Sequence, residues 1–137
     1  LERRDFLTAV DCFICNRQEA EILFSSDFSD INPEKMVDII SDKIHAAGFR
    51  RLIVTLGSDG AVYAGQNGEK GWCPARRVKV KDTTGAGDAY NGALVTGLAE
   101  GMTMVEAAEL ATACSAISVT RVGAQTAVPW RSEINNI

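Results

Sequence analysis

Short apolar runs bounded by polar residues divide the chain into predicted strands. The run at 9–15 is apolar except for Asp11, and the run at 51–56 contains the apolar stretch Leu52-Ile53-Val54, which is typical of strands buried in a sheet. A Gly57-Ser58-Asp59-Gly60 turn and a Gln66-Asn67-Gly68 hairpin turn separate the shorter runs that follow. The predicted strands are therefore 9–15, 51–56, 61–64, 69–73 and 77–80.

Apolar residues at helical spacing predict the helices. In the segment after Pro33, apolar side chains recur every three or four positions, and Gly48 ends the pattern. Two further helices are predicted at 89–100 and 104–120, the second rich in the small residues that permit close packing. Shorter helical segments are predicted at 1–8, 16–24 and 130–137. The order β-α-α-β-β-β-β-loop-α-α favours the second half of a three-layer α/β domain.

Composition and charge narrow the possible functions. Of the 137 residues 46% are hydrophobic, enough for a packed core of one domain or a piece of one, and the start at Leu1 suggests a fragment. The formal net charge of −4 argues against a nucleic-acid partner. The apolar runs are far shorter than a membrane span and we identify no signal peptide, so no membrane partner is expected.

We predict that the four cysteines are reduced thiols. Cys12 and Cys15 have C-x-x-C spacing, but positions three apart on a strand face opposite sides, and a redox pair would normally open a helix. Cys73 and Cys114 are interpreted as reduced residues that fill space, which indicates a cytoplasmic protein. The single histidine, His45, is predicted on a surface helix, so histidine-based catalysis is not expected.

The stretch from Asp82 to Asp88, DTTGAGD, carries the strongest chemical signal. Its two glycines flank an alanine between a predicted strand and a predicted helix, so the backbone can approach a ligand closely. A helix that starts here directs unpaired N–H groups and the positive end of its dipole at an anion. The Asp88 carboxylate would repel phosphate, and it suits a base that takes a proton from an attacking hydroxyl.

Simpler explanations exist for the same residues. An ordinary Gly-rich turn with Asp88 as a helix N-terminal charge accounts for DTTGAGD by itself, and a capping box accounts for Asn16 and Glu19. Other phosphate motifs do not fit. A dinucleotide fingerprint requires glycine where Tyr90 stands, and a P-loop requires a Gly-Lys pair that the chain lacks.

Taken together, the motifs resemble those of the ribokinase-type (PfkB) sugar kinases. Residues 82–94, DTTGAGDAYNGAL, are similar to the C-terminal signature of that family. Residues 16–21, NRQEAE, resemble its N-x-x-E motif, and 55–60, TLGSDG, its nucleotide-side strand and turn. Residues 119–130, VTRVGAQTAVPW, are closest to the ribokinases within the family. The order and separations of these motifs match over nearly the whole chain.

The resemblance implies a fold and an architecture. The chain would be the C-terminal portion of a three-layer α/β/α ribokinase-like fold, carrying the nucleotide site and the base across residues 1–137. The β lid and most sugar contacts would lie in a missing N-terminal half, so the fragment alone is expected to be inactive. The resemblance also implies a homodimer for the full-length protein.

The resemblance assigns roles to individual residues. Asp88 would be the catalytic base, and Gly85, Ala86 and Gly87 the anion hole for the transferred phosphoryl group. Asn16 and Glu19 would lie near the triphosphate and hydrated Mg²⁺. The ATP groove would be lined by Thr55, Gly57, Ser58, Gly60 and Thr112, the last replacing a His or Asn common near adenine.

The resemblance further implies a K⁺ site built mostly from backbone carbonyls. A further ligand position that is often Ser is Ala127 here, so the site is expected to be weaker or to lack one side-chain ligand. A simpler interpretation of Asp82 is a turn residue at a strand end. The positions that match the family's cation site are Asp82, Thr84, Ser118, Arg121 and Gly123.

The expected function is ATP-dependent phosphorylation of a sugar hydroxyl, with ribose the favoured substrate and ATP, Mg²⁺ and K⁺ as cofactors. One alternative is another sugar or a nucleoside kinase of the same family. The other is a non-catalytic nucleotide-binding fragment or regulatory module.

Overall fold

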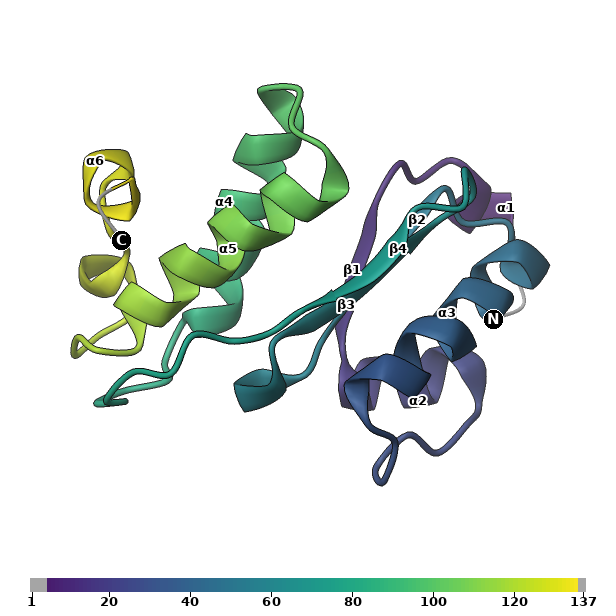
Figure 1. The fold of residues 1–137 in the computed structure, drawn as a ribbon, viewed down its shortest axis with the longest axis horizontal. Helices are drawn as coiled ribbons and strands as arrows, with labels where there is room; N and C mark the ends of the chain where they lie inside the picture. Colours follow the sequence, from purple (N-terminus) through teal and green to yellow (C-terminus); the bar gives the residue numbers. More distant parts are fainter. Residues whose placement is uncertain (1–4, 136–137) are drawn as a thin grey trace. The chain divides into compact units, whose positions relative to one another are not determined.

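The computed structural model describes residues 5–135, which fall into two compact units divided after Trp72 (Figure 1). We call them the N-terminal unit and the C-terminal unit. The N-terminal unit contains α1 (Asp5–Thr8), β1 (Phe13–Asn16), α2 (Arg17–Phe24), α3 (Pro33–Ala47), β2 (Arg51–Thr55), the 3₁₀ turn η1 (Gly57–Asp59), β3 (Ala61–Gly65) and most of β4 (Lys70–Cys73). The C-terminal unit contains α4 (Ala86–Ala99), α5 (Met104–Ser118), η2 (Gln125–Ala127) and α6 (Arg131–Ile134).

The strands form a sheet in the order β1-β2-β3-β4. β1 and β2 are parallel, and their register pairs Phe13 with Leu52 and Asn16 with Thr55. β2 and β3 are antiparallel. Because β1 and β2 end side by side, the segments that follow them, α2 and η1, start from the same edge of the sheet. Ligands of open α/β sheets bind at this carboxyl edge.

One face of this sheet is covered by α2 and α3 (Figure 1). Alternate residues of β2 and β3 point to that face, as the period of a strand requires. The α3 helix is fixed at both ends, since the Asn32 side chain accepts from the N–H of Lys35 and Gly48 ends the helix at φ 82°. The shared core consists chiefly of Met36, Val37, Ile40, Ile44, Leu52, Val54, Val62 and Ala64.

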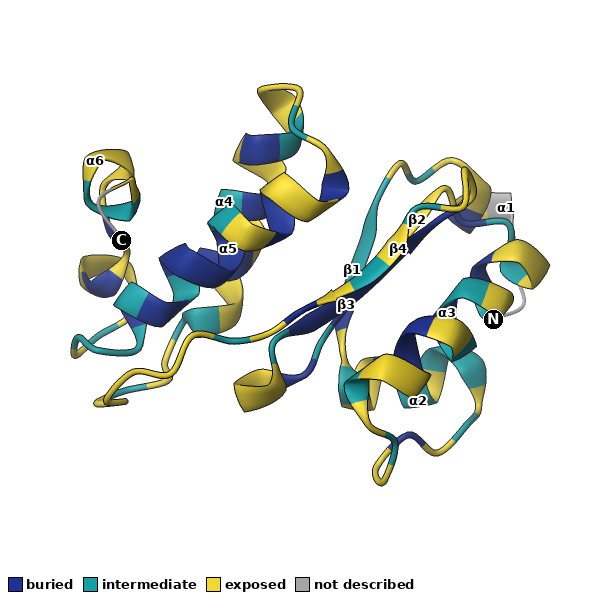
Figure 2. Ribbon diagram, in the orientation of Figure 1, coloured by how far each residue is buried: buried dark blue, intermediate teal, exposed yellow. Residues whose placement is uncertain are grey.

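The C-terminal unit is built on the contact between α4 and α5. A side chain at Gly97 would place its Cβ 3.2 Å from both Cα and Cβ of Ala107, so the two backbones approach closely where both residues are small. Buried positions run along α5 (Figure 2). The small residues predicted to allow close packing are therefore at the interface of these helices.

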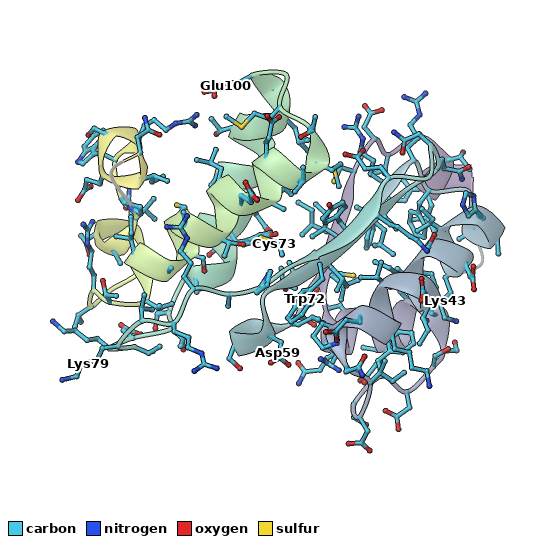
Figure 3. The ribbon with its side chains drawn as sticks, in the orientation of Figure 1. Lys43, Asp59, Trp72, Cys73, Lys79 and Glu100 are labelled. Atoms are coloured by element: carbon cyan, nitrogen blue, oxygen red, sulfur yellow. The ribbon has the colours of Figure 1, made fainter. Side chains whose placement is uncertain are left out.

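The predicted strand at 77–80 is wrong. Residues 74–80 form no regular element, and Lys79 is exposed (Figure 3). At the end of the segment, the N–H groups of Lys81 and Asp82 both donate to the carbonyl of Val119, at 2.7 and 3.2 Å. The backbone is thus bound to the residue after α5, and no strand among residues 5–135 pairs with it.

Other boundaries also differ from the predictions. The first strand begins at Phe13 rather than at residue 9, because pairing with β2 begins there. The α4 helix begins at Ala86, three residues before the predicted start, so the Gly loop itself supplies the first turn. The predicted helix at 1–8 is confirmed over Asp5–Thr8, and its first four residues lie outside the described range.

The cysteines are unpaired, as predicted. Cys12 precedes β1 instead of lying in it. Burial raises the pKa of the Cys12 thiol to about 11 and that of Cys15 to about 12, so neither thiolate is favoured. His45 is exposed on α3. Across residues 5–135, no helix has the length and apolar character needed to cross a membrane.

Candidate functional site

Asn16 and Glu19 face each other at the start of α2. The Asn16 side chain accepts from the N–H of Glu19 at 2.8 Å, and Glu19 Oε2 accepts from the N–H of Asn16 at 2.9 Å. This is the capping box that the sequence also allowed. Both residues are exposed, and within residues 5–135 no hydrogen bond occupies Glu19 Oε1. The capping box therefore leaves one carboxylate oxygen available beside the end of β1.

The turn after β2 lies beside this helix start. Gly57 has φ 60°, and Gly60 has φ 93° with ψ −133°, a combination essentially restricted to glycine. The turn is closed by hydrogen bonds from the N–H of Gly60 to Gly57 and from the N–H of Leu56 to the carbonyl of Gly60. Ser58 is exposed at its tip. Thus Asn16, Glu19, Thr55, Gly57, Ser58 and Gly60 gather at the carboxyl edge of β1 and β2.

The start of α4 is uncapped. Gly85 is the N-cap residue at φ 73°, and no side chain caps the helix there. The N–H of Ala86 donates to the carbonyl of Thr83 at 3.1 Å. The N–H groups of Gly87 and Asp88 have no acceptor in the described part of the chain. Two donors and the positive end of the helix dipole are therefore free to meet an anion.

Asp88 is exposed in the first turn of α4, next to these donors. Together with Gly85, it lines an open groove of about 640 Å³ that lies wholly within the C-terminal unit. The groove follows the exposed face of α4 toward Glu100, which forms an ion pair with Arg131 at 2.9 Å. Most of its other lining residues are apolar or small: Ala89, Gly92, Ala93, Leu110, Cys114, Ala124, Val128, Pro129 and Ile134.

Asp82 connects the loop before α4 to the loop after α5. Its Oδ1 accepts from the N–H of Thr84 at 2.9 Å, and its Oδ2 accepts from the N–H of Gly123 at 3.0 Å. The Thr84 side chain and the N–H groups of Gly123 and Thr84 lower the pKa of the Asp82 carboxyl to about 2. The two loops are thus fixed to each other through one carboxylate and through the carbonyl of Val119.

The remaining candidate cation residues, Ser118 and Arg121, lie at the end of α5 and on the loop that follows it. The Ser118 carbonyl accepts from the N–H of Arg121 at 3.1 Å, and the Arg121 side chain pairs with Glu133 of α6. Arg121 and the N–H of Trp130 lower the pKa of the Glu133 carboxyl. Ser118 is only 1% exposed, and its buried hydroxyl has no hydrogen-bond partner within residues 5–135. A buried hydroxyl of this kind requires a partner, an ion or a water molecule.

Thr112 differs from the other candidates. It is buried in α5, and its hydroxyl lies 3.3 Å from Cys73 Sγ. The structure therefore describes two groups of candidate residues, one in each unit, and Thr112 is buried in the C-terminal unit. Among the described residues, no cluster of three or more His, Cys, Asp or Glu side chains could hold a metal ion.

Asp82→Asn is expected to flatten the acid dependence of stability in the intact polypeptide that carries this chain. The folded pKa of about 2 lies below the ordinary value of 3.8, so the bound carboxylate stabilises the fold above that value. This contribution is lost as the pH falls through about 2. Urea unfolding midpoints measured from pH 5 to pH 2 should fall less steeply for the variant than for the wild type.

Asp30→Asn provides the control, because Asp30 is an exposed carboxylate in the loop before α3. Its unfolding midpoints should follow the wild type over the whole pH range. Identical curves for Asp82→Asn and the wild type would show that Asp82 does not hold the two loops together.

The chain is similar to a known protein family over most of its length. Residues 2–131 match the pattern of the "pfkB family carbohydrate kinase". A ribokinase of Schizosaccharomyces pombe is 37% identical over 132 residues, covering 96% of this chain and 41% of that protein. A pseudouridine kinase of Escherichia coli is 32% identical over 116 residues, covering 85% of this chain and 36% of that protein. The chain thus spans about two fifths of the curated relatives it matches.

Solved structures show the same relationship. A ribokinase of Thermotoga maritima, 33% identical, superimposes with a TM-score of 0.80 over 98% of this chain and 44% of its own. A ribokinase of Arabidopsis thaliana, solved with ribose and ATP, is 25% identical and gives a TM-score of 0.87 over 98% of this chain and 42% of its own. These neighbours confirm the predicted fold class, part of a three-layer α/β/α ribokinase-like fold.

Proposed function

Because this chain belongs to the pfkB family of carbohydrate kinases, we propose that the intact polypeptide transfers a phosphoryl group from ATP to a sugar hydroxyl. Ribose is the favoured acceptor, since two ribokinases, 37% and 36% identical, match over 96% and 94% of this chain. The observation that carries the proposal is the start of α4, where the Asp88 carboxylate lies beside N–H groups that no acceptor in residues 5–135 occupies.

In the proposed reaction, Asp88 accepts the proton of the attacking hydroxyl. The helix start formed by Gly85, Ala86 and Gly87 binds the transferred phosphoryl group and stabilises its developing charge. The free N–H groups of Gly87 and Asp88 support this role. The N–H of Ala86 donates to the carbonyl of Thr83, and this bond fixes the turn before the helix. Such donors cost no reorganisation at the moment of transfer, because the helix already orients them.

The carboxyl edge of β1 and β2 is proposed to bind ATP. Thr55, Gly57, Ser58 and Gly60 would line the groove, and Asn16 would lie near the triphosphate. Mg²⁺ keeps much of its water and binds through few carboxylate oxygens, which suits the unoccupied Oε1 of Glu19. Thr112 is proposed as a further nucleotide-site residue; its hydroxyl is buried and lies 3.3 Å from Cys73 Sγ.

We also propose a K⁺ site between the two loops that Asp82 joins. Asp82, Thr84, Ser118, Arg121 and Gly123 would supply oxygens, mostly backbone carbonyls. The support is the buried Ser118 hydroxyl, which lacks a partner in the described chain, together with the bonds that hold both loops in place. A cation bound there would lend positive charge beneath the start of α4.

Potassium is therefore expected to raise the rate of the intact polypeptide by a measurable factor over a sodium-only buffer. Initial rates should be compared in KCl, NaCl and choline chloride at equal ionic strength, so that screening is constant. A rate that is the same in all three salts would favour Asp82 as a turn residue only, in agreement with Ala127 at the position where a serine ligand is often found.

A phosphorylation screen of the intact polypeptide against pentoses, hexoses and nucleosides tests the function. We expect ribose to be phosphorylated with the highest kcat/KM. Preference for a nucleoside would favour the second candidate function, a nucleoside kinase of the same family, which the similarity to a pseudouridine kinase supports. Nucleotide binding with no transfer to any acceptor would favour a non-catalytic module. The 137 residues alone, assayed in parallel, are expected to phosphorylate no sugar.

A further inference from the structure

Arg17, the first residue of α2, connects three segments at the carboxyl edge of β1 and β2. Its Nη1 donates to the carbonyl oxygens of Phe28 and Ile31, at 2.5 and 3.0 Å, in the loop between α2 and α3. Its Nη2 lies 3.7 Å from Oδ2 of Asp59 in η1. The Arg17 side chain is 21% exposed, so this cation is largely withdrawn from water and committed to these partners.

A second side chain also binds the turn that contains Asp59. Trp72 of β4 donates its indole N–H to the carbonyl oxygen of Asp59 at 2.7 Å. Figure 3 shows Trp72 lying next to Asp59. Asp59 is therefore held through its carboxylate by Arg17 and through its main chain by Trp72. We call Arg17, Asp59 and Trp72 the turn clamp.

The turn needs such support because of its glycines. Gly57 and Gly60 both adopt positive φ values, and glycine is the residue with the greatest backbone freedom to lose on ordering. Only short-range bonds among Leu56, Gly57, Asp59 and Gly60 close the turn internally. The turn clamp adds bonds to α2 and β4, which are regular elements, and so fixes the turn relative to Asn16 and Glu19.

We propose that Arg17, Asp59 and Trp72 are positioning residues for nucleotide binding, which hold the Gly57–Gly60 turn in its binding geometry before the ligand arrives. The inference rests on the proposed function, because it assumes that this edge binds ATP. A loop that is ordered in advance costs less entropy on binding, so the turn clamp acts on nucleotide affinity and not on the transfer step.

Calorimetric titration of the intact polypeptide with ADP tests the turn clamp. Asp59→Asn removes one partly exposed ion pair and should weaken ADP binding by about twofold to fivefold. Trp72→Phe keeps the ring and removes the indole N–H, with a loss of similar size expected. Arg17→Met also removes the bonds to Phe28 and Ile31, and about a tenfold loss is expected. The double variant of Arg17 and Asp59 should lose less than the product of the two single losses.

Asp38→Asn is the matched control, since it breaks the Lys70–Asp38 pair between β4 and α3 in the same unit. It should leave ADP affinity unchanged, and kcat at saturating ATP should stay within about twofold of the wild type for all single variants. Melting temperatures identify any variant that fails to fold. Asp59→Asn changes an exposed side chain, so it should fold and the test does not depend on the other variants.

Two results would overturn the turn clamp alone: an unchanged ADP affinity in Asp59→Asn and Trp72→Phe, or a lower kcat with unchanged affinity. A wild type that binds no ADP would overturn both the turn clamp and the proposed function. In a further outcome, the ADP affinities of the wild type and the variants follow the expected order while the wild type phosphorylates no acceptor. That result would support the turn clamp and overturn only the proposed function.

Discussion

Asp88→Asn in the intact polypeptide is expected to lower kcat by about two to four decades, the usual contribution of a positioned general base. The amide has the size of the carboxylate but cannot accept the proton of the attacking hydroxyl. The N–H groups of Gly87 and residue 88 belong to the backbone and remain in place, so ATP affinity should be nearly unchanged. Steady-state kinetics with ribose, together with ADP titration, separate the two effects.

Glu109→Gln is the control for this variant, because Glu109 is an exposed carboxylate on α5. It makes the same chemical change away from the start of α4 and should leave kcat and ATP affinity as in the wild type. Near-normal turnover of Asp88→Asn would rule out Asp88 as the base. It would leave Asp88 as a helix N-terminal charge, the simpler explanation that the sequence alone allows.

The elements that could be predicted from the sequence are those whose boundaries are set by neighbouring residues. The helix α3 begins at Pro33 and ends before Gly48, as predicted, because both limits depend on local backbone geometry. The helix α2 begins after Asn16 for the same reason, with Glu19 completing the capping box. The hairpin turn at 66–68 lies between β3 and β4 as its sequence indicates.

The wrong strand at 77–80 shows where local patterns fail. Val78 and Val80 alternate with charged residues, which is the pattern of a half-buried strand. A strand also needs a partner, and pairing is a long-range property that the alternation does not reveal. In the structure both valines are exposed, 40% and 56%, and the segment ends on the Val119 carbonyl.

The candidate site also contains residues that local sequence reveals and residues that only long-range contacts bring together. Glycine at 85 and the acid at 88 could be found from the sequence, since an uncapped helix start with positive φ requires glycine locally. The bond between Asp82 and the N–H of Gly123 joins residues 41 positions apart, and no local pattern indicates it. The turn clamp was missed too, because Arg17 and Trp72 look like ordinary surface residues in the sequence.

Gly85→Ala in the intact polypeptide is expected to reduce kcat by about tenfold to a hundredfold, less than outright removal of an oxyanion donor. Gly85 has φ 73°, a conformation that costs alanine about 1–2 kcal/mol. A Cβ there would also lie 3.2 Å from Cα and Cβ of Ala124, so the start of α4 or the 119–130 segment must shift. Single-turnover rates with saturating ATP and ribose measure the transfer step directly.

Gly101→Ala is the control that separates displacement of the α4 start from backbone strain alone. Gly101 follows the other end of α4 with φ 84°, but a Cβ there meets nothing within 4 Å. Both variants should lose a similar amount of stability from the left-handed conformation, whereas only Gly85→Ala moves the N–H groups that face the transferred phosphoryl group. Equal kcat values for the two variants would mean that the geometry of this helix start does not govern phosphoryl transfer, and the anion hole would then have to lie elsewhere in the intact polypeptide.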